Sequence, residues 1–165
     1  AIKNARKLLK ETKCDAIKIE NNYNNLNIVK AFKKSKINVM GHIGYTPQFK
    51  KKFKVEGKTK SEQNKLIRQA LEIEKAGAFS IVIECVSKST AKKITNLLKI
   101  PTIGIGSSKS CDGQILVTDD LLGASGFYPK FVKKYANLEK IIDNAIKEFS
   151  KDVKSSKFPK NENSF

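Results

Sequence analysis

The stretch FSIVIE at residues 79–84 is a short, continuous apolar run that ends on a carboxylate. Its length and its β-branched side chains predict a buried β-strand. Apolar residues at helical spacing precede it in residues 59–76 and follow it in residues 88–98. A strand between two helices is the repeating unit of a parallel sheet covered by helices, so this stretch predicts the α/β class.

The same alternation of strand and helix runs along the rest of the chain. Thr59 and Glu62 predict a capping box at the start of the helix before residue 79, and Gly77 predicts its end. Further strands are expected at residues 16–20, 37–43, 101–105 and 115–117, and further helices at 1–13, from 26 onward and at 138–153. Five strands that alternate with helices predict a parallel α/β architecture.

Length and composition favour one domain that lies in an aqueous compartment. We expect a domain at residues 1–153 and a tail without periodicity at 154–165. The cysteines at 14, 85 and 111 show no CxxC or Cys/His spacing, which predicts reduced thiols and neither disulfides nor zinc. The sequence has no apolar run of about 18 residues and no signal pattern, which predicts a soluble, cytoplasmic protein.

The formal net charge of +17 raises the possibility of a nucleic-acid partner. Among the 33 basic residues, however, only Arg6 and Arg68 are arginines, and phosphate and base recognition usually depends on the bidentate arginine fork. The lysines are spread along every expected helix, with Asn-rich stretches such as residues 21–25 between them. We therefore favour a compositional bias on solvated faces over a specific polyanion site.

Four ionisable side chains lie at or near the ends of expected strands: Lys18, Glu20, His42 and Glu84. In parallel α/β barrels the carboxyl ends of the strands form the active-site mouth. Alternation along residues 16–20 sends the two isoleucines toward the helices and Lys18 and Glu20 toward the interior. We expect the four side chains to line one cavity.

From position alone each of these residues has two interpretations. Glu84 could accept a proton, because partial desolvation makes a carboxylate a better acceptor, or could pair with a lysine. Lys18 and Glu20 could pair with each other, or could bind an anionic substrate and a hard cation. His42 could contact a ligand or make one structural hydrogen bond. The stretch GIGSS at 104–108 could present backbone N–H groups to an anion or permit a tight turn.

Six motifs resemble the ketopantoate hydroxymethyltransferase family, and they follow one another in the family's order. They are IKIE at 17–20, MGHIGYTPQ at 40–48, EKAGA at 74–78, IECV at 83–86, IPTIGIG at 100–106 and DGQILV at 112–117. The resemblance covers nearly the whole chain, including Phe158-Pro159 near its end. It implies a (β/α)₈ TIM barrel of the phosphoenolpyruvate mutase/isocitrate lyase type, of which this chain would be the C-terminal portion with the last five βα units.

The resemblance also implies a reaction and a set of roles. The family transfers a hydroxymethyl group from methylenetetrahydrofolate to α-ketoisovalerate with Mg²⁺, which gives ketopantoate in the first step of pantothenate biosynthesis. Matched by motif, Glu84 would be the catalytic proton acceptor, Lys18 and His42 would bind the substrate, and Glu20 would be a metal ligand. Resemblance to the family's decamers implies a homo-oligomer. The lysine-rich composition and the lack of a long apolar run predict no specific nucleic-acid partner and no membrane partner.

Two departures from the family pattern affect these expectations. The family's first three strands, which carry other metal and substrate ligands, have no counterpart here, so we expect this chain alone to be inactive. The loop at 45–58 looks shorter than in the family and carries Phe49, Lys50, Lys51, Lys52 and Phe53 in place of glycines. Two alternatives stay open: a carbon–carbon bond lyase of the same superfamily, which the lack of a nucleophilic cysteine motif disfavours, and a non-catalytic basic binding fragment.

Overall fold

The computed structural model describes residues 1–20, 26–50 and 53–165. The chain divides into two compact units, Ala1–Ile115 and Leu116–Phe165. The Asn-rich segment at 21–25 and two lysines of the basic loop, Lys51 and Lys52, lie outside the described residues. The division into a barrel domain at 1–153 and a tail at 154–165 stays a prediction.

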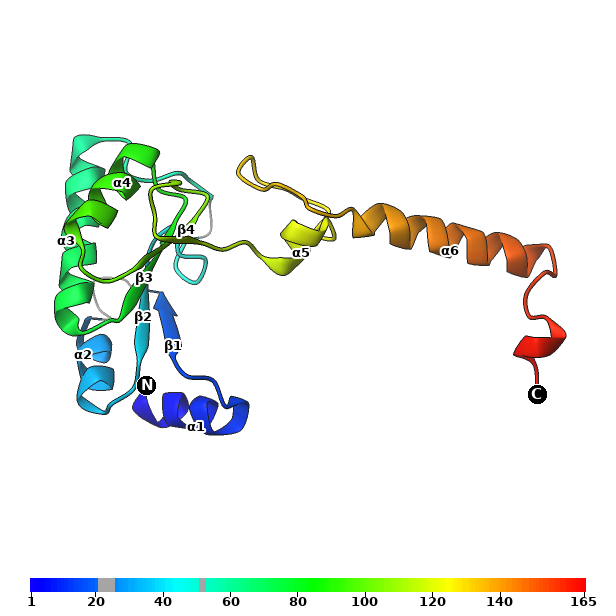
Figure 1. Cartoon of the computed structure of the whole chain (residues 1–165), viewed down its shortest axis with the longest axis horizontal. Coiled ribbons are helices and arrows are strands. Elements are labelled where there is room, and N and C mark those ends of the chain that lie inside the picture. Colours follow the sequence, from blue (N-terminus) through cyan, green and yellow to red (C-terminus); the bar gives the residue numbers. More distant parts are fainter. Residues whose placement is uncertain (21–25, 51–52) are drawn as a thin grey trace. The chain divides into compact units, whose positions relative to one another are not determined.

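The first unit is a five-stranded sheet (Figure 1). A helix lies between each two successive strands among the first four, but none lies between the fourth and the fifth, so the expected alternation ends there. All four pairings are parallel, and the strand order β1-β2-β3-β4-β5 follows the sequence. The strands are β1 (Ile17–Glu20), β2 (Val39–Gly44), β3 (Ser80–Glu84), β4 (Thr102–Ile105) and β5 (Gly113–Gln114), and the helices are α1 (Ile2–Thr12), α2 (Leu26–Lys34), α3 (Lys60–Ala76) and α4 (Lys88–Leu97). The predicted parallel α/β class is confirmed.

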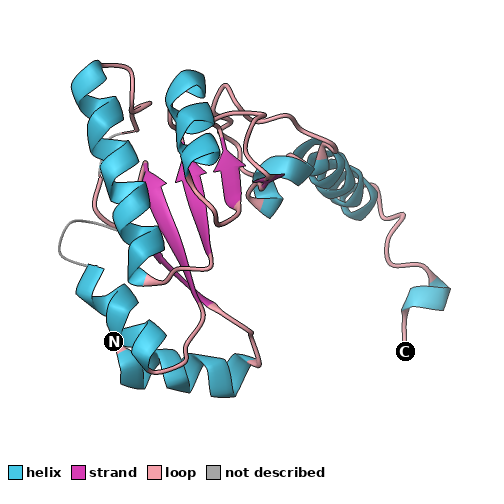
Figure 2. Ribbon diagram, turned by 60° about the vertical axis from the view of Figure 1, so that its left-hand side comes forward, coloured by secondary structure: helices cyan, strands magenta, loops and turns pink. Residues whose placement is uncertain are grey.

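Successive strand residues divide between a face that packs on helices and the opposite face. Ile43, Ile81 and Ile83 are at most 1% exposed and belong to the core formed with α2, α3 and α4. Figure 2 shows the strand arrows pointing the same way beside these helices, so the carboxyl ends of the strands lie together. The side chains that alternate with this core, including His42 and Glu84, face the other way.

Local signals in the sequence explain where α3 begins and ends. Thr59 accepts a hydrogen bond from the Glu62 N–H, and the Glu62 carboxylate accepts one from the Thr59 N–H, which completes the predicted capping box. The hydrogen bond from Lys54 and those from the backbone lower the pKa of Glu62 to about 2. Gly77 ends the helix at φ +102°, a conformation that glycine adopts without strain.

The strand expected at 115–117 is wrong. The fifth strand is Gly113–Gln114, paired with Ile103 and Gly104, and only the N–H of Ile115 continues the ladder by bonding to the Gly104 carbonyl. Ile115 and Val117 are each 53% exposed. Their β-branched side chains suggested a strand, but the chain turns into a short helix at Thr118 before a longer strand can form.

The second unit holds α5 (Thr118–Leu122), α6 (Leu138–Lys154) and a 3₁₀ turn at Asn161–Asn163. The helix expected at 138–153 is therefore confirmed. Asn137 accepts a hydrogen bond from the Lys140 N–H at its start. Ile141, Ile146 and Phe149 are exposed on α6. None of the predicted site residues lies in this unit.

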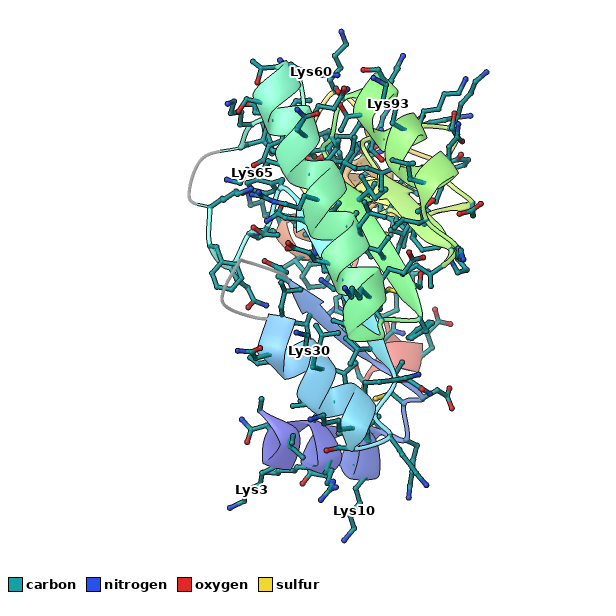
Figure 3. The ribbon with its side chains drawn as sticks, turned by 90° about the vertical axis from the view of Figure 1, so that its left-hand side faces the viewer. Lys3, Lys10, Lys30, Lys60, Lys65 and Lys93 are labelled. Atoms are coloured by element: carbon teal, nitrogen blue, oxygen red, sulfur yellow. The ribbon has the colours of Figure 1, made fainter. Side chains whose placement is uncertain are left out.

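The lysines that dominate the charge are distributed over several helices. In Figure 3, Lys3 and Lys10 extend from α1, Lys30 from α2, Lys60 and Lys65 from α3, and Lys93 from α4. Lys93 donates a hydrogen bond to the Gln63 side chain. This distribution agrees with the predicted bias on solvated faces. No helix within residues 1–20, 26–50 and 53–165 is long and apolar enough to cross a membrane.

The contact between the ends of β2 and β3 generates a prediction about Gly44. Its φ is +90°, and an added Cβ would lie 2.1 Å from the Glu84 carbonyl oxygen. We expect Gly44→Ala to lower the free energy of unfolding by more than about 2 kcal/mol, because backbone strain and a backbone clash act together. Urea unfolding followed by circular dichroism measures the change.

Gly77→Ala is the matched control. Gly77 also has a positive φ, but an added Cβ there would meet the flexible side chain of Lys33. Its cost should therefore be limited to the conformational penalty of roughly 1–2 kcal/mol. Equal losses in the two variants would contradict the close approach of the strand ends.

Candidate functional site

Three of the four predicted site residues form a continuous chain of polar contacts. The Lys18 Nζ lies 3.2 Å from the His42 Nδ1. On the other side of the ring, the His42 Nε2 lies 3.1 Å from the Glu84 Oε2. The histidine side chain is 2% exposed and the glutamate side chain 16%. The structure thus places a buried imidazole between a cation and an anion.

Backbone register explains why these three residues meet. β1 and β2 pair Lys18 with Met40, and β2 and β3 pair His42 with Val82. His42 therefore lies two positions beyond Met40, the residue paired with Lys18. Glu84 likewise lies two positions beyond Val82, the residue paired with His42. Positions two apart share a face, so Lys18, His42 and Glu84 lie on one face and step across three strands.

Glu20 lies beside this chain and has a different partner. It pairs with His42 in the β1–β2 register and is 7% exposed. Its Oε2 accepts a hydrogen bond of 2.9 Å from the backbone N–H of Gln48. The amide at Gln48 was missed by sequence reasoning, because a backbone group carries no side-chain signal. Glu20 therefore connects β1 to the loop that follows β2.

The described part of that loop is held against the strand ends. The Tyr45 N–H donates to the Glu84 carbonyl over 2.8 Å, and the Lys50 Nζ donates to the Gly44 carbonyl over 2.7 Å. Lys50 also bonds to Glu56, whose backbone bridges to Val86 beyond β3. The loop thereby fixes the backbone on both sides of Glu84.

The start of the next strand, β4, is held by Asp112, a carboxylate that lies within the DGQILV motif. Its Oδ2 accepts hydrogen bonds from the Thr102 N–H (2.8 Å) and the Thr102 hydroxyl (2.9 Å). These bonds lower the pKa of Asp112. They join the approach to β5 to the start of β4. Asp112 therefore has a structural role in this arrangement.

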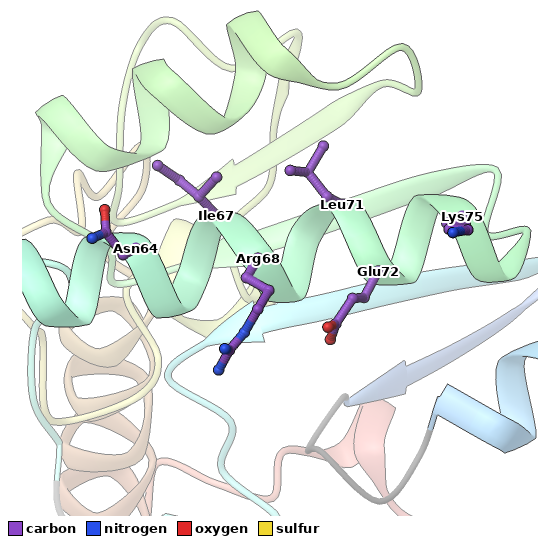
Figure 4. Close-up of a pocket in the computed structure, with 6 residues that line it drawn as sticks. All are labelled: Asn64, Ile67, Arg68, Leu71, Glu72 and Lys75. Carbon is purple, nitrogen blue, oxygen red and sulfur yellow. The ribbon is translucent and has the colours of Figure 1, made fainter.

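Only two of the four predicted site residues, Lys18 and Glu20, line the cavity at β1. A cavity of about 430 Å³ is lined by Lys18, Glu20 and Gln48 together with residues of α1 and α2. Its lining does not include His42 or Glu84. A second hollow, of about 370 Å³, lies on α3 and is lined by Asn64, Ile67, Arg68, Leu71, Glu72 and Lys75 (Figure 4). It contains none of the predicted site residues, so it is not the candidate site.

The residues present do not form a metal site by themselves. Within residues 1–20, 26–50 and 53–165, no group of three or more His, Cys, Asp or Glu side chains could hold a metal ion. Magnesium requires near-octahedral oxygen coordination. Glu20 offers one carboxylate, and one of its oxygens already accepts the Gln48 N–H. Glu20 alone therefore does not complete a magnesium site.

Comparison with known proteins decides the family. A family model described as "Ketopantoate hydroxymethyltransferase" matches residues 1–161. The chain belongs to the ketopantoate hydroxymethyltransferase family. The resemblance predicted from its motifs is confirmed.

Three relatives of the ketopantoate hydroxymethyltransferase family carry the name 3-methyl-2-oxobutanoate hydroxymethyltransferase. The protein of Pelagibacter ubique (strain HTCC1062) is 50% identical over 165 residues, which cover 100% of this chain and 64% of the relative. The protein of Thermotoga maritima is 49% identical over 169 residues, and the match covers 100% of this chain and 62% of the relative. The protein of Saccharolobus islandicus (strain L.S.2.15) is 52% identical over 162 residues, and the match covers 96% of this chain and 60% of the relative. The chain thus spans less than two thirds of the length of these relatives.

Burial gives a prediction about the three thiols. Cys85 follows Glu84 and is fully buried; desolvation, followed by the charge of Glu84, raises its pKa to about 12. Cys111 is also buried, whereas Cys14 is exposed. We expect a thiol reagent at neutral pH to modify one cysteine per native chain, and none in Cys14→Ser. Rapid modification of Cys85, located by mass spectrometry, would contradict this and would revive a cysteine-based lyase.

Proposed function

We propose that this chain carries part of the active site of an enzyme that transfers a hydroxymethyl group from methylenetetrahydrofolate to α-ketoisovalerate, giving ketopantoate. This is the first step of pantothenate biosynthesis. The chain's family and the names of its relatives support the reaction. The observation that carries the proposal is the contact chain from Lys18 through His42 to Glu84 at the carboxyl ends of adjacent parallel strands.

Glu84 is proposed as the proton acceptor. Hydroxymethyl transfer needs a carbon nucleophile, which forms when a base removes the C3 proton of the keto acid and leaves an enolate. A general base must lie within hydrogen-bond reach of that proton and must be free to accept it. The Glu84 side chain retains 16% exposure at the end of β3. This exposure supports access from the strand-end side.

Lys18 and His42 are proposed as substrate-binding residues. Lys18 is one of the residues that line the cavity of about 430 Å³, and a lysine ammonium pairs with the carboxylate of a 2-keto acid. His42 and Glu84 do not line that cavity, so the role of His42 is proposed from the 3.2 Å contact between its Nδ1 and the Lys18 Nζ. The developing negative charge of the enolate would then face the lysine, which stabilises it electrostatically.

For Mg²⁺ we propose a single ligand from this chain, Glu20, with the other ligands supplied by segments that its relatives possess beyond the matched region. The barrel of eight βα units, of which this chain would supply the last five, is proposed from the five parallel strands in sequence order. Homo-oligomerisation, the cytoplasm as location and the inactivity of this chain alone stay predictions.

The protein extended to the length of its relatives supplies the test. There, Glu84→Gln should lower kcat by about 100-fold or more, because the amide keeps the shape but cannot accept a proton. The dissociation constant of α-ketoisovalerate, measured by calorimetry, should change little. Steady-state ketopantoate formation gives kcat.

Glu148→Gln is the matched control, because Glu148 is an exposed carboxylate on α6. It should leave kcat unchanged. A Glu84→Gln enzyme with normal kcat would remove Glu84 from the proton-acceptor role. Failure of the unmodified protein to form ketopantoate would refute the reaction itself.

A further inference from the structure

A cavity of about 420 Å³ lies between the start of α4 and the loop that follows β4, apart from the candidate site. Only lysines and serines line it, and they are Lys88, Ser89, Lys92, Ser108, Lys109 and Ser110. We call it the basic cavity. Among the described residues, no aspartate or glutamate contributes to its lining. Ammonium and hydroxyl groups donate hydrogen bonds, so the composition of this lining suits an anion.

The three lysines of the basic cavity have no counter-charge within the protein. Lys88 and Lys92 are four positions apart on α4, so their side chains are neighbours on one helix face. Lys109 joins them from the loop after β4. Within residues 1–20, 26–50 and 53–165, none of the three forms an ion pair with a carboxylate. Like charges at this spacing repel each other, and a bound anion would relieve that repulsion.

The loop side of the basic cavity is held in place around Ser108, which is 7% exposed. The Gln114 Nε2 donates to the Ser108 carbonyl over 2.8 Å, and the Cys111 N–H donates to the same oxygen over 3.2 Å. The Ser108 Oγ accepts the Ser110 N–H over 3.1 Å. A wall that is already ordered loses less entropy when a ligand binds. The basic cavity is therefore preformed on this side.

The basic cavity lies at the same end of the sheet as the candidate site. α4 begins four residues after Glu84, the last residue of β3, and the loop begins after Ile105, the last residue of β4. The Cys85 N–H donates to the Ile105 carbonyl over 2.8 Å, which holds the two strand exits together. In parallel α/β proteins, ligands bind at the carboxyl ends of the strands. This position distinguishes the three lysines from those spread over the outer helix faces.

We propose that the basic cavity binds a multiply charged oxyanion, supplied either by free phosphate or by the glutamate tail of a folate. The lysines would pair with its oxygens as compact point charges, and the serine hydroxyls would donate to them. The GIGSS stretch at 104–108 then serves both of its interpretations, because Gly106 turns the chain at φ +59° and Ser108 lines the basic cavity. The folate source rests on the proposed function, whereas the phosphate source does not.

Calorimetric titration of the 165-residue chain with inorganic phosphate tests the anion site. We expect saturable binding of one phosphate per chain. Lys92→Met/Lys109→Met should weaken it by about tenfold or more, because hydrogen bonds to charged groups are the stronger kind. Absence of saturable binding by either phosphate or the folate tail would overturn the proposal.

Lys3→Met/Lys10→Met is the matched control. It removes the same charge from α1, where both lysines are exposed (Figure 3). The affinity for phosphate should stay nearly unchanged. Equal weakening in the two double variants would mean that the net charge of the chain attracts the anion, and would overturn the site.

NMR of the ¹⁵N-labelled chain locates the bound anion. Phosphate should shift the backbone amide signals of Ser108 and Ser110 and leave those of α1 in place. In Lys92→Met/Lys109→Met, the same phosphate concentration should shift the two serine signals much less. Shifts confined to residues outside the basic cavity would contradict the assignment.

Tri-γ-glutamate, the free tail of a folate, distinguishes the two sources. If the tail is the occupant, tri-γ-glutamate should bind the native chain more tightly than glutamate does, and Lys92→Met/Lys109→Met should remove this preference. In the protein extended to the length of its relatives, the same variant should then raise the KM of methylenetetrahydrofolate triglutamate with similar kcat. Phosphate binding without tail binding would assign the basic cavity to free phosphate. Because the titrations need no catalysis, failure of the proposed reaction would leave their result unchanged.

Discussion

The close approach of the carboxyl ends of β2 and β3 is the constraint on which the candidate site depends. Gly44 leaves no room for a side chain against the Glu84 carbonyl, and the Tyr45 N–H bonds to that same oxygen. Because His42 lies two residues before Gly44 on β2, this contact also fixes the position of Glu84 relative to His42. A slip of one residue between the strands would turn one of these side chains toward the helices and break the contact chain to Lys18.

Much of this arrangement follows from patterns in the sequence. An apolar run that ends on Glu84, bounded by helical repeats, is enough to predict a buried parallel strand. The period of two along β1 correctly predicts that Lys18 and Glu20 face away from Ile17 and Ile19, which pack against the core. The capping box at Thr59 is equally local, since both of its partners lie within one turn. Such features depend on neighbours in sequence.

Features that depend on distant neighbours were not predictable in this way. The Ile115–Val117 run has the composition of a strand, but pairing ends at Gln114 and the two side chains stay half-exposed. The partner of Glu20 is the amide of Gln48, and nothing in the residue type of Gln48 indicates it. The contacts of His42 with Lys18 and Glu84 form only when the register aligns three strands. From the sequence alone, His42 could either contact a ligand or make one structural hydrogen bond.

Isotope exchange at C3 of α-ketoisovalerate tests the central claim most directly, namely that Glu84 removes this proton. The protein extended to the length of its relatives is incubated with substrate and Mg²⁺ in D₂O without the folate donor, and deuterium at C3 is followed by ¹H NMR. The account predicts exchange by the native protein and by Cys14→Ser, and exchange reduced to the uncatalysed rate in Glu84→Gln. Exchange at the native rate in Glu84→Gln would contradict it.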